Sequence, residues 1–208
     1  VLSSVSRPEL VCNGMEIHAL SIKYGLDSAE IAWAVINMYA KCGLVLEAEE
    51  VFNHLIVRNV VLWNQLITGY GEYRIYKEVV KCVELMQQEG IKQDTVTMVW
   101  LLKTSINMQI IEMGLESHIQ IIKQGVEADV YLGSTIVDMY VKFGLISEAK
   151  KVFLMLPFRN VVAWNVLITG DAEHGPFEEA FRCLQQMEDE SVSPTSLTFV
   201  GILCKYSI

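Results

Sequence analysis

Hydrophobic positions along the chain recur with the period of an α-helix. One stretch carries large apolar residues at i, i+3, i+4 and i+7, which is the spacing of a single buried helix face. These residues are Trp63, Leu66, Ile67 and Tyr70, and the pattern returns from Trp164. A second helical stripe follows at Val79, Cys82, Val83 and Met86. The pattern predicts paired helices throughout and no sheet.

The chain also repeats itself. Residues 38–69 reappear as residues 139–170, and 20 of the 32 positions are identical. Self-similarity at a fixed spacing is typical of stacked supersecondary units that share one continuous core. This favours a binding role over catalysis.

Smaller units lie within the 101-residue spacing. Glycines mark turns between helices, and we expect such turns at Gly25, Gly43, Gly71, Gly90, Gly125, Gly144 and Gly175. The chain then divides into blocks of 31, 35, 35, 31 and 35 residues, namely 29–59, 60–94, 95–129, 130–160 and 161–195. The 31-residue blocks carry Ala48-x-x-x-Phe52 and Ala149-x-x-x-Phe153, a small residue one turn from an aromatic one, where two helices cross closely.

Composition removes several alternatives. The chain has 208 residues, of which 52% are hydrophobic, but no apolar run reaches the roughly 18 to 20 residues that span a bilayer. Its five cysteines form no Cys-x-x-Cys pair, and Cys82 and Cys183 occupy equivalent helix positions. We therefore expect these two as core residues in a reducing compartment, with no metal site and no cofactor.

Several sequence runs resemble the pentatricopeptide repeat family. These runs are INMYAKCG at 36–43, RNVVLWNQLITG at 58–69 and GIKQD at 90–94. The order of lengths is similar to the short, P-type and long motifs of the PLS subclass of land plants. The resemblance implies an all-α, right-handed α-solenoid (superhelix) of helix-turn-helix repeats. Short motifs would be 29–59 and 130–160, P-type motifs 60–94 and 161–195, and a long motif 95–129. Truncated long motifs would be 1–28 and 196–208, so we expect the chain to be part of a longer array.

The resemblance implies recognition of single-stranded RNA, one base per repeat. In the family, the fifth and last residues of a motif read the base from the groove side of the first helix. The pairs carried over are Asn64 with Asp94 for uracil, Val99 with Asp129 for weak or no reading, Ser134 with Asn160 for adenine, and Asn165 with Thr195 for a loose pyrimidine preference. In the first short motif the fifth and last residues are Trp33 and Asn59, which do not form a usable reading pair, and the second residue, in the clamp position, is Glu30.

The second residue of each motif would contact the base from the side. These clamps are Val61, Val96, Tyr131 and Val162. The residue chemistry agrees with the reading roles, because an amide such as Asn64 offers both a donor and an acceptor to a pyrimidine edge, whereas Asp94 only accepts. The small hydroxyl of Ser134 leaves room for a purine. An aromatic partner contributes about 1 to 3 kcal/mol per stacked base, so Tyr131 is expected to be the strongest clamp.

Each of these positions also has a purely structural interpretation. An Asn in the first turn can cap a helix, which applies to Asn59 and Asn160, whereas Asn64 and Asn165 lie inside helices where Asn has poor propensity. Trp63 and Trp164 are in phase with the buried stripe and are expected in the core. His18 and His118 recur at matching positions and are expected to pack or to hydrogen-bond across repeats rather than bind metal.

Charge weakens the case for nonspecific nucleic-acid binding. The formal net charge is −9, whereas nonspecific RNA binders gain affinity from a basic surface. A basic line formed by Lys41, Lys142, Arg58 and Arg159 would support weak binding of about four or five bases, with a steep loss in salt.

Three functions follow from the sequence. The first is a target-recognition adaptor in RNA editing (cytidine to uridine) or RNA processing, in a mitochondrion or chloroplast, with single-stranded RNA and other editing or processing factors as partners, and with neither membrane nor DNA. The second is a protein-binding scaffold similar to tetratricopeptide repeats, or a decayed gene copy that binds nothing. The third is an enzyme, which we do not expect, because the segment lacks the His-x-Glu and Cys-x-x-Cys motifs of a zinc deaminase.

Overall fold

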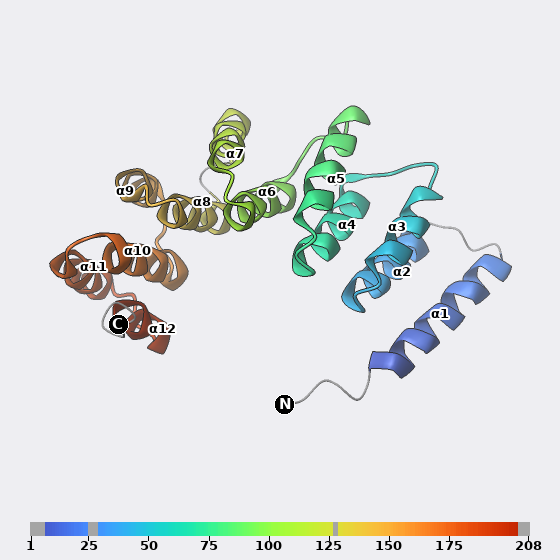
Figure 1. Ribbon diagram of the computed structural model, residues 1–208, viewed down its shortest axis with the longest axis horizontal. Helices are drawn as coiled ribbons and strands as arrows, with labels where there is room; N and C mark the ends of the chain where they lie inside the picture. Colours follow the sequence, from blue (N-terminus) through green and yellow to red (C-terminus); the bar gives the residue numbers. More distant parts are fainter. Residues whose placement is uncertain (1–6, 25–28, 127–128, 204–208) are drawn as a thin grey trace. The chain divides into compact units, whose positions relative to one another are not determined.

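The computed structural model describes residues 7–24, 29–126 and 129–203. In these ranges the chain forms twelve α-helices and no strand (Figure 1), so the all-helical fold class is confirmed. The helices are α1 Arg7–Lys23, α2 Ala29–Lys41, α3 Val45–Asn53, α4 Val60–Glu72, α5 Tyr76–Gln88, α6 Thr95–Met108, α7 Ile111–Gln124, α8 Val130–Lys142, α9 Ile146–Met155, α10 Val161–His174, α11 Phe177–Asp189 and α12 Ser196–Leu203. The predicted turn at Gly25, and parts of the first and last predicted motifs, lie outside the described residues.

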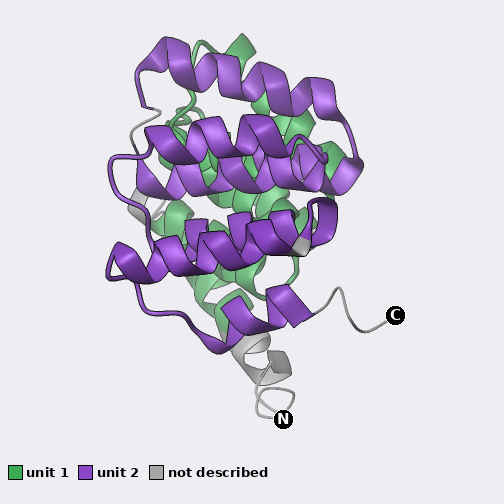
Figure 2. Ribbon diagram, turned by 90° about the vertical axis from the view of Figure 1, so that its left-hand side faces the viewer, with its two compact units in different colours: residues 1–100 green, residues 101–208 purple. Residues whose placement is uncertain are grey.

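The chain divides into two compact units, residues 1–100 and 101–208 (Figure 2), and each is described by itself. In the first unit α2 packs against α3 and α4, and α4 packs against α5. In the second unit α8 packs against α9 and α10, and α10 packs against α11 and α12. The first helices α2, α4, α8 and α10 thus contact their hairpin partners, and α2, α8 and α10 also contact the first helix of the next hairpin, which is the packing pattern of a helical-repeat array. Every predicted block from 29 to 195 holds one helix pair.

The predicted buried stripe forms the core of these hairpins. Trp63, Leu66, Ile67 and Tyr70 are each at most 2% exposed, as the helical period predicted. The Ala-x-x-x-Phe positions are also buried, and the Phe52 ring meets the Trp63 ring edge-on with 4.5 Å between centroids. An equivalent pair, Phe153 and Trp164, lies at 4.7 Å in the second unit. Such an aromatic pair contributes about 0.5 to 1.5 kcal/mol beyond its buried area, which ties each hairpin to the next.

In four of the five predicted blocks, the last residue caps the first helix of the following block. The side-chain oxygen of Asn59 accepts a hydrogen bond from the Leu62 backbone N–H at 3.0 Å. The other caps are Asp94 to Thr97, Asp129 to Leu132 and Asn160 to Ala163, at 2.8 to 3.1 Å. Each cap satisfies a backbone donor that has no partner inside its helix, and contributes about 1 kcal/mol.

One predicted turn is wrong. Gly71 lies inside α4 and is buried, and the following turn is made by Arg74, which adopts a left-handed conformation with φ of 60°. Glycine is required at this position because the side chain of Trp100 packs closely against it, and not because the chain turns there. A Cβ at this position would lie 2.2 Å from the indole ring of Trp100. The expected turns at Gly43, Gly90, Gly125, Gly144 and Gly175 do lie between helices.

Candidate functional site

The pair expected to read uracil forms a closed hydrogen-bond network across two blocks. The amide nitrogen of Asn64, on α4, donates to both carboxylate oxygens of Asp94 at 2.9 Å. The hydroxyl of Thr97, on α6, donates to the amide oxygen of Asn64 at 2.7 Å. Asn64 is 7% exposed and Thr97 is fully buried. The amide is therefore held from both ends.

The block 161–195 repeats this network with Thr195 in place of the aspartate. The hydroxyl of Thr198 donates to the amide oxygen of Asn165 at 2.5 Å and accepts from the Thr195 backbone N–H at 2.9 Å. The amide nitrogen of Asn165 reaches the hydroxyl of Thr195 at 3.4 Å. The carboxylate of the first network accepts two short hydrogen bonds, whereas the hydroxyl at the same place in the second network accepts one long bond. The amide nitrogen of Asn165 is therefore bound more weakly than that of Asn64.

Sequence reasoning missed the two buried threonines. Thr97 and Thr198 are 101 positions apart, so extending the self-comparison beyond residue 69 would have shown that both copies keep a threonine there. Nothing in their spacing from Asn64 and Asn165 along the chain indicates the contact, because the partners are 33 residues apart and meet only after the helices stack.

The other two expected reading pairs are not joined. The hydroxyl of Ser134 donates to the Val130 carbonyl of its own helix at 2.7 Å, and the side chain is 4% exposed. Among the described residues no hydrogen bond links it to Asn160, whose side-chain oxygen caps α10. Val99 is buried and offers no polar atom, and Asp129 caps α8.

The expected clamp positions share a partly exposed, apolar character. Val61, Val96, Tyr131 and Val162 are 45% to 59% exposed, in contrast with the buried residues three positions later in each helix. Lys103, on α6, places its ammonium group 3.3 Å from the Tyr131 hydroxyl and 5.8 Å from the centre of the ring. Trp33, in the first short motif, is 40% exposed. A base beside Tyr131 would meet both an aromatic face and a positive charge.

Of the four residues expected to form a basic line, the two arginines are in ion pairs and the two lysines are exposed. The guanidinium groups of Arg58 and Arg159 form ion pairs with Glu89 and Glu190, both at 2.5 Å. They also lie over the rings of buried phenylalanines of their own blocks. These two arginines therefore link helices and are neutralised, while Lys41 and Lys142 are exposed.

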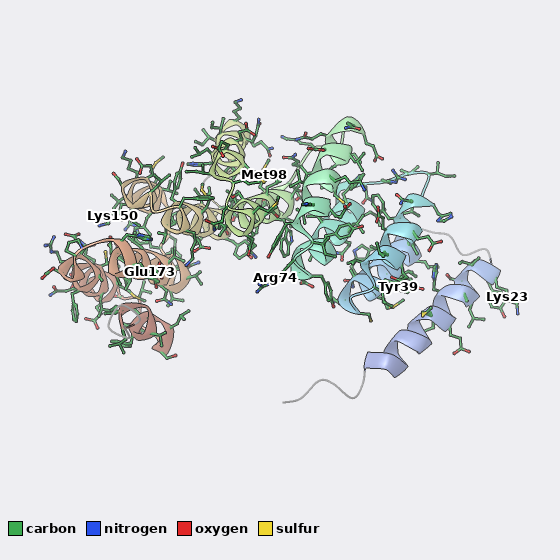
Figure 3. The ribbon with its side chains drawn as sticks, viewed as in Figure 1. Lys23, Tyr39, Arg74, Met98, Lys150 and Glu173 are labelled. Carbon is green, nitrogen blue, oxygen red and sulfur yellow. The ribbon has the colours of Figure 1, made fainter. Side chains whose placement is uncertain are left out.

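A buried polar contact differs between the two copies. In the first unit the Tyr70 hydroxyl donates to the Glu49 carboxylate. At the equivalent positions of the second unit, the Lys150 ammonium (Figure 3) forms an ion pair with Asp171 at 2.9 Å and with Glu179 at 3.3 Å. Burial lowers the pKa of Lys150, but the hydrogen bond and charge of Asp171 outweigh it and raise the pKa overall.

Two expected core cysteines lie beside these contacts. Cys82 and Cys183 are buried, as predicted, and the Cys183 thiol donates to Asp171 at 3.0 Å. The pKa of each thiol is raised to about 12, mainly by burial, and for Cys183 the hydrogen bond to Asp171 is the second cause. Both remain protonated at neutral pH, which is typical of core residues and unlike reactive thiols.

The two recurring histidines contact tyrosines of the next block, as expected. The ring nitrogen Nδ1 of His18 lies 3.1 Å from the hydroxyl of Tyr39 (Figure 3), and that of His118 lies 2.8 Å from Tyr140. Among the described residues no group of three or more metal-ligating side chains comes together. In the same part of the chain no helix has the length and apolarity needed to cross a bilayer.

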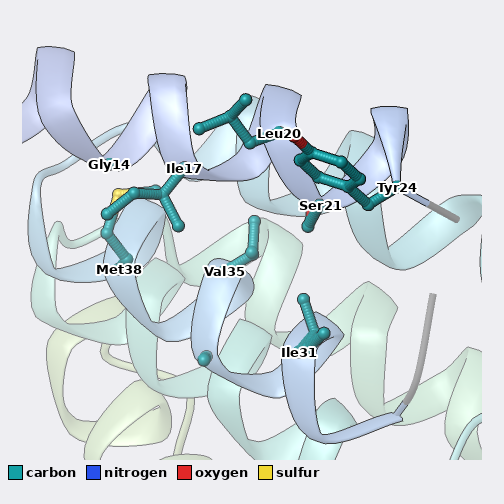
Figure 4. A pocket seen from close by; sticks show the side chains of 9 residues that line it. Gly14, Ile17, Leu20, Ser21, Tyr24, Ile31, Val35 and Met38 are labelled. Atoms are coloured by element: carbon teal, nitrogen blue, oxygen red, sulfur yellow. The ribbon is translucent and has the colours of Figure 1, made fainter. Parts of the chain in front are cut away.

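A hollow of about 500 Å³ lies between α1 and α2 of the first unit (Figure 4). Its lining is almost entirely apolar and includes Ile17, Leu20, Val35 and Met38. The hydroxyl of Ser21, also in the lining, donates to the His18 carbonyl. Among the described residues that line the hollow there is no charged side chain.

Comparisons with known proteins agree with the repeat architecture. The PPR repeat model matches residues 34–60, 61–91 and 134–161, and the PPR repeat family model matches residues 159–207. A mitochondrial pentatricopeptide repeat-containing protein of Arabidopsis thaliana is 37% identical over 95% of this chain and 36% of its own length. A chloroplastic one from the same plant is 29% identical over 93% of this chain and 28% of its own length. The chain thus spans about a third of these curated relatives.

A solved structure supports the fold. The PPR domain of protein-only RNase P 1 of Arabidopsis thaliana, crystallised in complex with tRNA, superposes with a TM-score of 0.66 over 83% of this chain and 95% of that domain, at 13% identity. The helical hairpins and the matching repeat models agree. The chain belongs to the pentatricopeptide repeat family.

Proposed function

We propose that the chain binds single-stranded RNA, with one base per repeat, as the target-recognition part of a PLS-type protein. The network of Asn64, Asp94 and Thr97 carries this proposal. A nearly buried amide inside a helix has poor propensity there, yet two copies keep it and surround it with polar partners. Beside it lies a half-exposed apolar residue, Val61, in the position expected to contact a base.

The donor and acceptor inventory supports a pyrimidine at the first P-type repeat. One N–H of Asn64 can be shared between the two carboxylate oxygens of Asp94, which leaves its other N–H and one lone pair on its oxygen for a base. Uracil presents an N–H beside a carbonyl, so it matches both. At the second P-type repeat, Thr195 both donates and accepts, which supports a looser preference. Val99 supplies no hydrogen bond, so the long repeat is expected to read weakly or not at all.

The second short repeat is proposed to read adenine. Its fifth residue, Ser134, is small, and its hydroxyl is engaged with its own helix. The amide nitrogen of Asn160 is not needed for the cap, which uses only the side-chain oxygen. Tyr131 supplies the stacking surface, with Lys103 close to its ring. Stacking on an aromatic residue contributes about 1 to 3 kcal/mol per base.

The biological setting is part of the proposal. Curated relatives carry mitochondrial and chloroplastic names, which supports an organelle. The order of 31-, 35- and 35-residue blocks supports the PLS subclass, and with it a role in cytidine-to-uridine editing or in RNA processing. In this role the chain selects the target, and partner factors carry out the chemistry.

The test is a change of base preference in one repeat. Asn64→Thr beside Asp94 is expected to shift the preferred base at that site from uracil toward guanine by about ten-fold, the equivalent of one to two hydrogen bonds. Affinities are measured by fluorescence anisotropy on short RNAs that vary one base at a time. Asn107→Thr is the matched control, because Asn107 is an exposed Asn whose amide bonds its own helix. An unchanged profile for Asn64→Thr would favour the protein-binding alternative.

A further inference from the structure

Two fully buried threonines contact the reading amides but cannot reach a ligand. Thr97 is 0% exposed and Thr198 is 1% exposed. Each donates its hydroxyl hydrogen to the amide oxygen of an Asn in the preceding block, at 2.7 and 2.5 Å. Any effect of these hydroxyls on a bound base must therefore pass through the amide.

The two threonines follow the blocks whose fifth residue is an asparagine, Asn64 or Asn165. They stand at the third position of the blocks that begin at residues 95 and 196. The third positions of the blocks beginning at 60, 130 and 161 are Leu62, Leu132 and Ala163. The preceding blocks of these three carry Trp, Val and Ser at the fifth position, so they have no amide to orient.

We propose that Thr97 and Thr198 are positioning residues that set which way round the reading amide faces its base. The proposal rests on the proposed function, since it concerns how Asn64 and Asn165 would meet a base. An amide can turn by 180° and exchange its donor and acceptor ends with little change of shape. A hydroxyl that donates to the amide oxygen opposes that exchange, because the turned amide would direct its own N–H groups at the hydroxyl hydrogen.

The two networks differ in how much depends on the threonine. Asp94 is acceptor-only, so it orients Asn64 even without Thr97. Thr195 can donate or accept, and its bond to Asn165 is 3.4 Å long, so it orients the amide weakly. The Thr198 hydroxyl is directed, because it accepts from the Thr195 backbone N–H and turns its hydrogen toward Asn165. Thr198 is thus the main orienting group of the second network.

Base discrimination at each repeat tests the proposal. Thr198→Val keeps the shape but removes the hydroxyl, and is expected to reduce discrimination between the best and second-best base at its own repeat by about five-fold, the value of one neutral hydrogen bond. Thr97→Val is expected to lose about two-fold, because Asp94 still orients the amide. Thr97→Ser and Thr198→Ser keep the donor and are expected to restore discrimination. Thr104→Val is the matched control, since Thr104 is buried in α6 and its hydroxyl has no partner among the described residues.

A measurement without RNA separates positioning from reading. In ¹⁵N-correlated NMR spectra the side-chain NH2 signals of Asn64 and Asn165 are expected to be well separated and protected from exchange, and those of Asn165 to converge in Thr198→Val. A loss of affinity that is equal for all four bases and accompanied by a lower melting temperature would overturn the proposal, as would unchanged amide signals in both Val variants. If the wild-type chain ignores RNA sequence altogether, the proposed function fails, and the amide signals alone decide whether the threonines position the amides.

Discussion

The ion pair between Lys150 and Asp171 makes a quantitative prediction about how neighbouring hairpins stay together. It joins α9 of one predicted block to α10 of the next, at the positions where the first copy has Glu49 and Tyr70. Replacing Lys150 with Met keeps the length of the side chain and removes the charge. Among the described side chains, the Asp171 carboxylate then keeps the Cys183 thiol as its one hydrogen-bond donor.

The magnitude follows from burial and distance. At 2.9 Å and an effective dielectric constant of about 20, two unit charges attract by about 6 kcal/mol, and desolvation offsets much of this. Removing one partner of a fully buried pair costs about 3 to 5 kcal/mol. The Asp171 side chain is 1% exposed, but Lys150 is 34% exposed, so water can reach the Lys150 side of the pair. We expect Lys150→Met to lower the free energy of unfolding by about 2 kcal/mol.

Urea denaturation followed by circular dichroism measures this loss. Tyr70→Phe is the matched variant in the first copy, and is expected to cost about 1 kcal/mol, because it removes one donor from a carboxylate that water can rehydrate. The double variant Lys150→Met with Asp171→Leu leaves no buried charge, and is expected to return to within about 1 kcal/mol of the wild type. A loss below about 0.5 kcal/mol for Lys150→Met, or a double variant no more stable than the single one, would refute the argument.

Three further outcomes are expected. Gly71→Ala should destabilise the chain by about 1 to 3 kcal/mol, since its Cβ would lie within 2.2 Å of the Trp100 ring, and Gly71→Ala with Trp100→Leu should recover part of the loss in the same urea assay. Burial raises the pKa of Asp138 despite the nearby Lys142 and Lys103, so the folded state disfavours its ionised form. Asp138→Asn should raise the melting temperature at pH 7. The gain should fade as the pH falls through the raised pKa of the folded state and be absent below the unfolded pKa of about 3.9. RNA affinity should fall steeply with salt concentration. In a plot of the logarithm of the binding constant against the logarithm of the salt concentration, Lys142→Gln should reduce the slope by about 0.7 if Lys142 contacts a phosphate. Arg58→Gln should leave this slope unchanged, because Glu89 already neutralises that arginine.

The hairpin architecture was accessible from the sequence because it depends on local periodicity. The stripe from Trp63 to Tyr70 and the small-to-aromatic spacing each lie within one helix, where 3.6-residue geometry relates position to burial. Gly71 was wrongly assigned to a turn because the sequence alone does not distinguish a glycine in a turn from one that packs against an aromatic ring, here the indole of Trp100, 29 residues away. The exchange of Glu49 and Tyr70 for Lys150 and Asp171 is visible when the copies are aligned, but becomes meaningful only once the helices are known to pack there.

If the amides of Asn64 and Asn165 read bases, the specificity of a repeat belongs to the junction between two blocks rather than to one block. The amide comes from the first helix of one block, and its partner Asp94 or Thr195 is the last residue of that same block. The threonine that holds the amide oxygen comes from the start of the next block. Asp94 forces the orientation by charge, whereas its counterpart Thr195 leaves that task to Thr198. Asp94→Thr alone would therefore make the orientation of Asn64 depend on Thr97, and would loosen the base preference although Asn64 itself is unchanged. A block moved by itself into another array would lose the third member of its network, so reading positions should be transferred together with the first turn of the helix that follows.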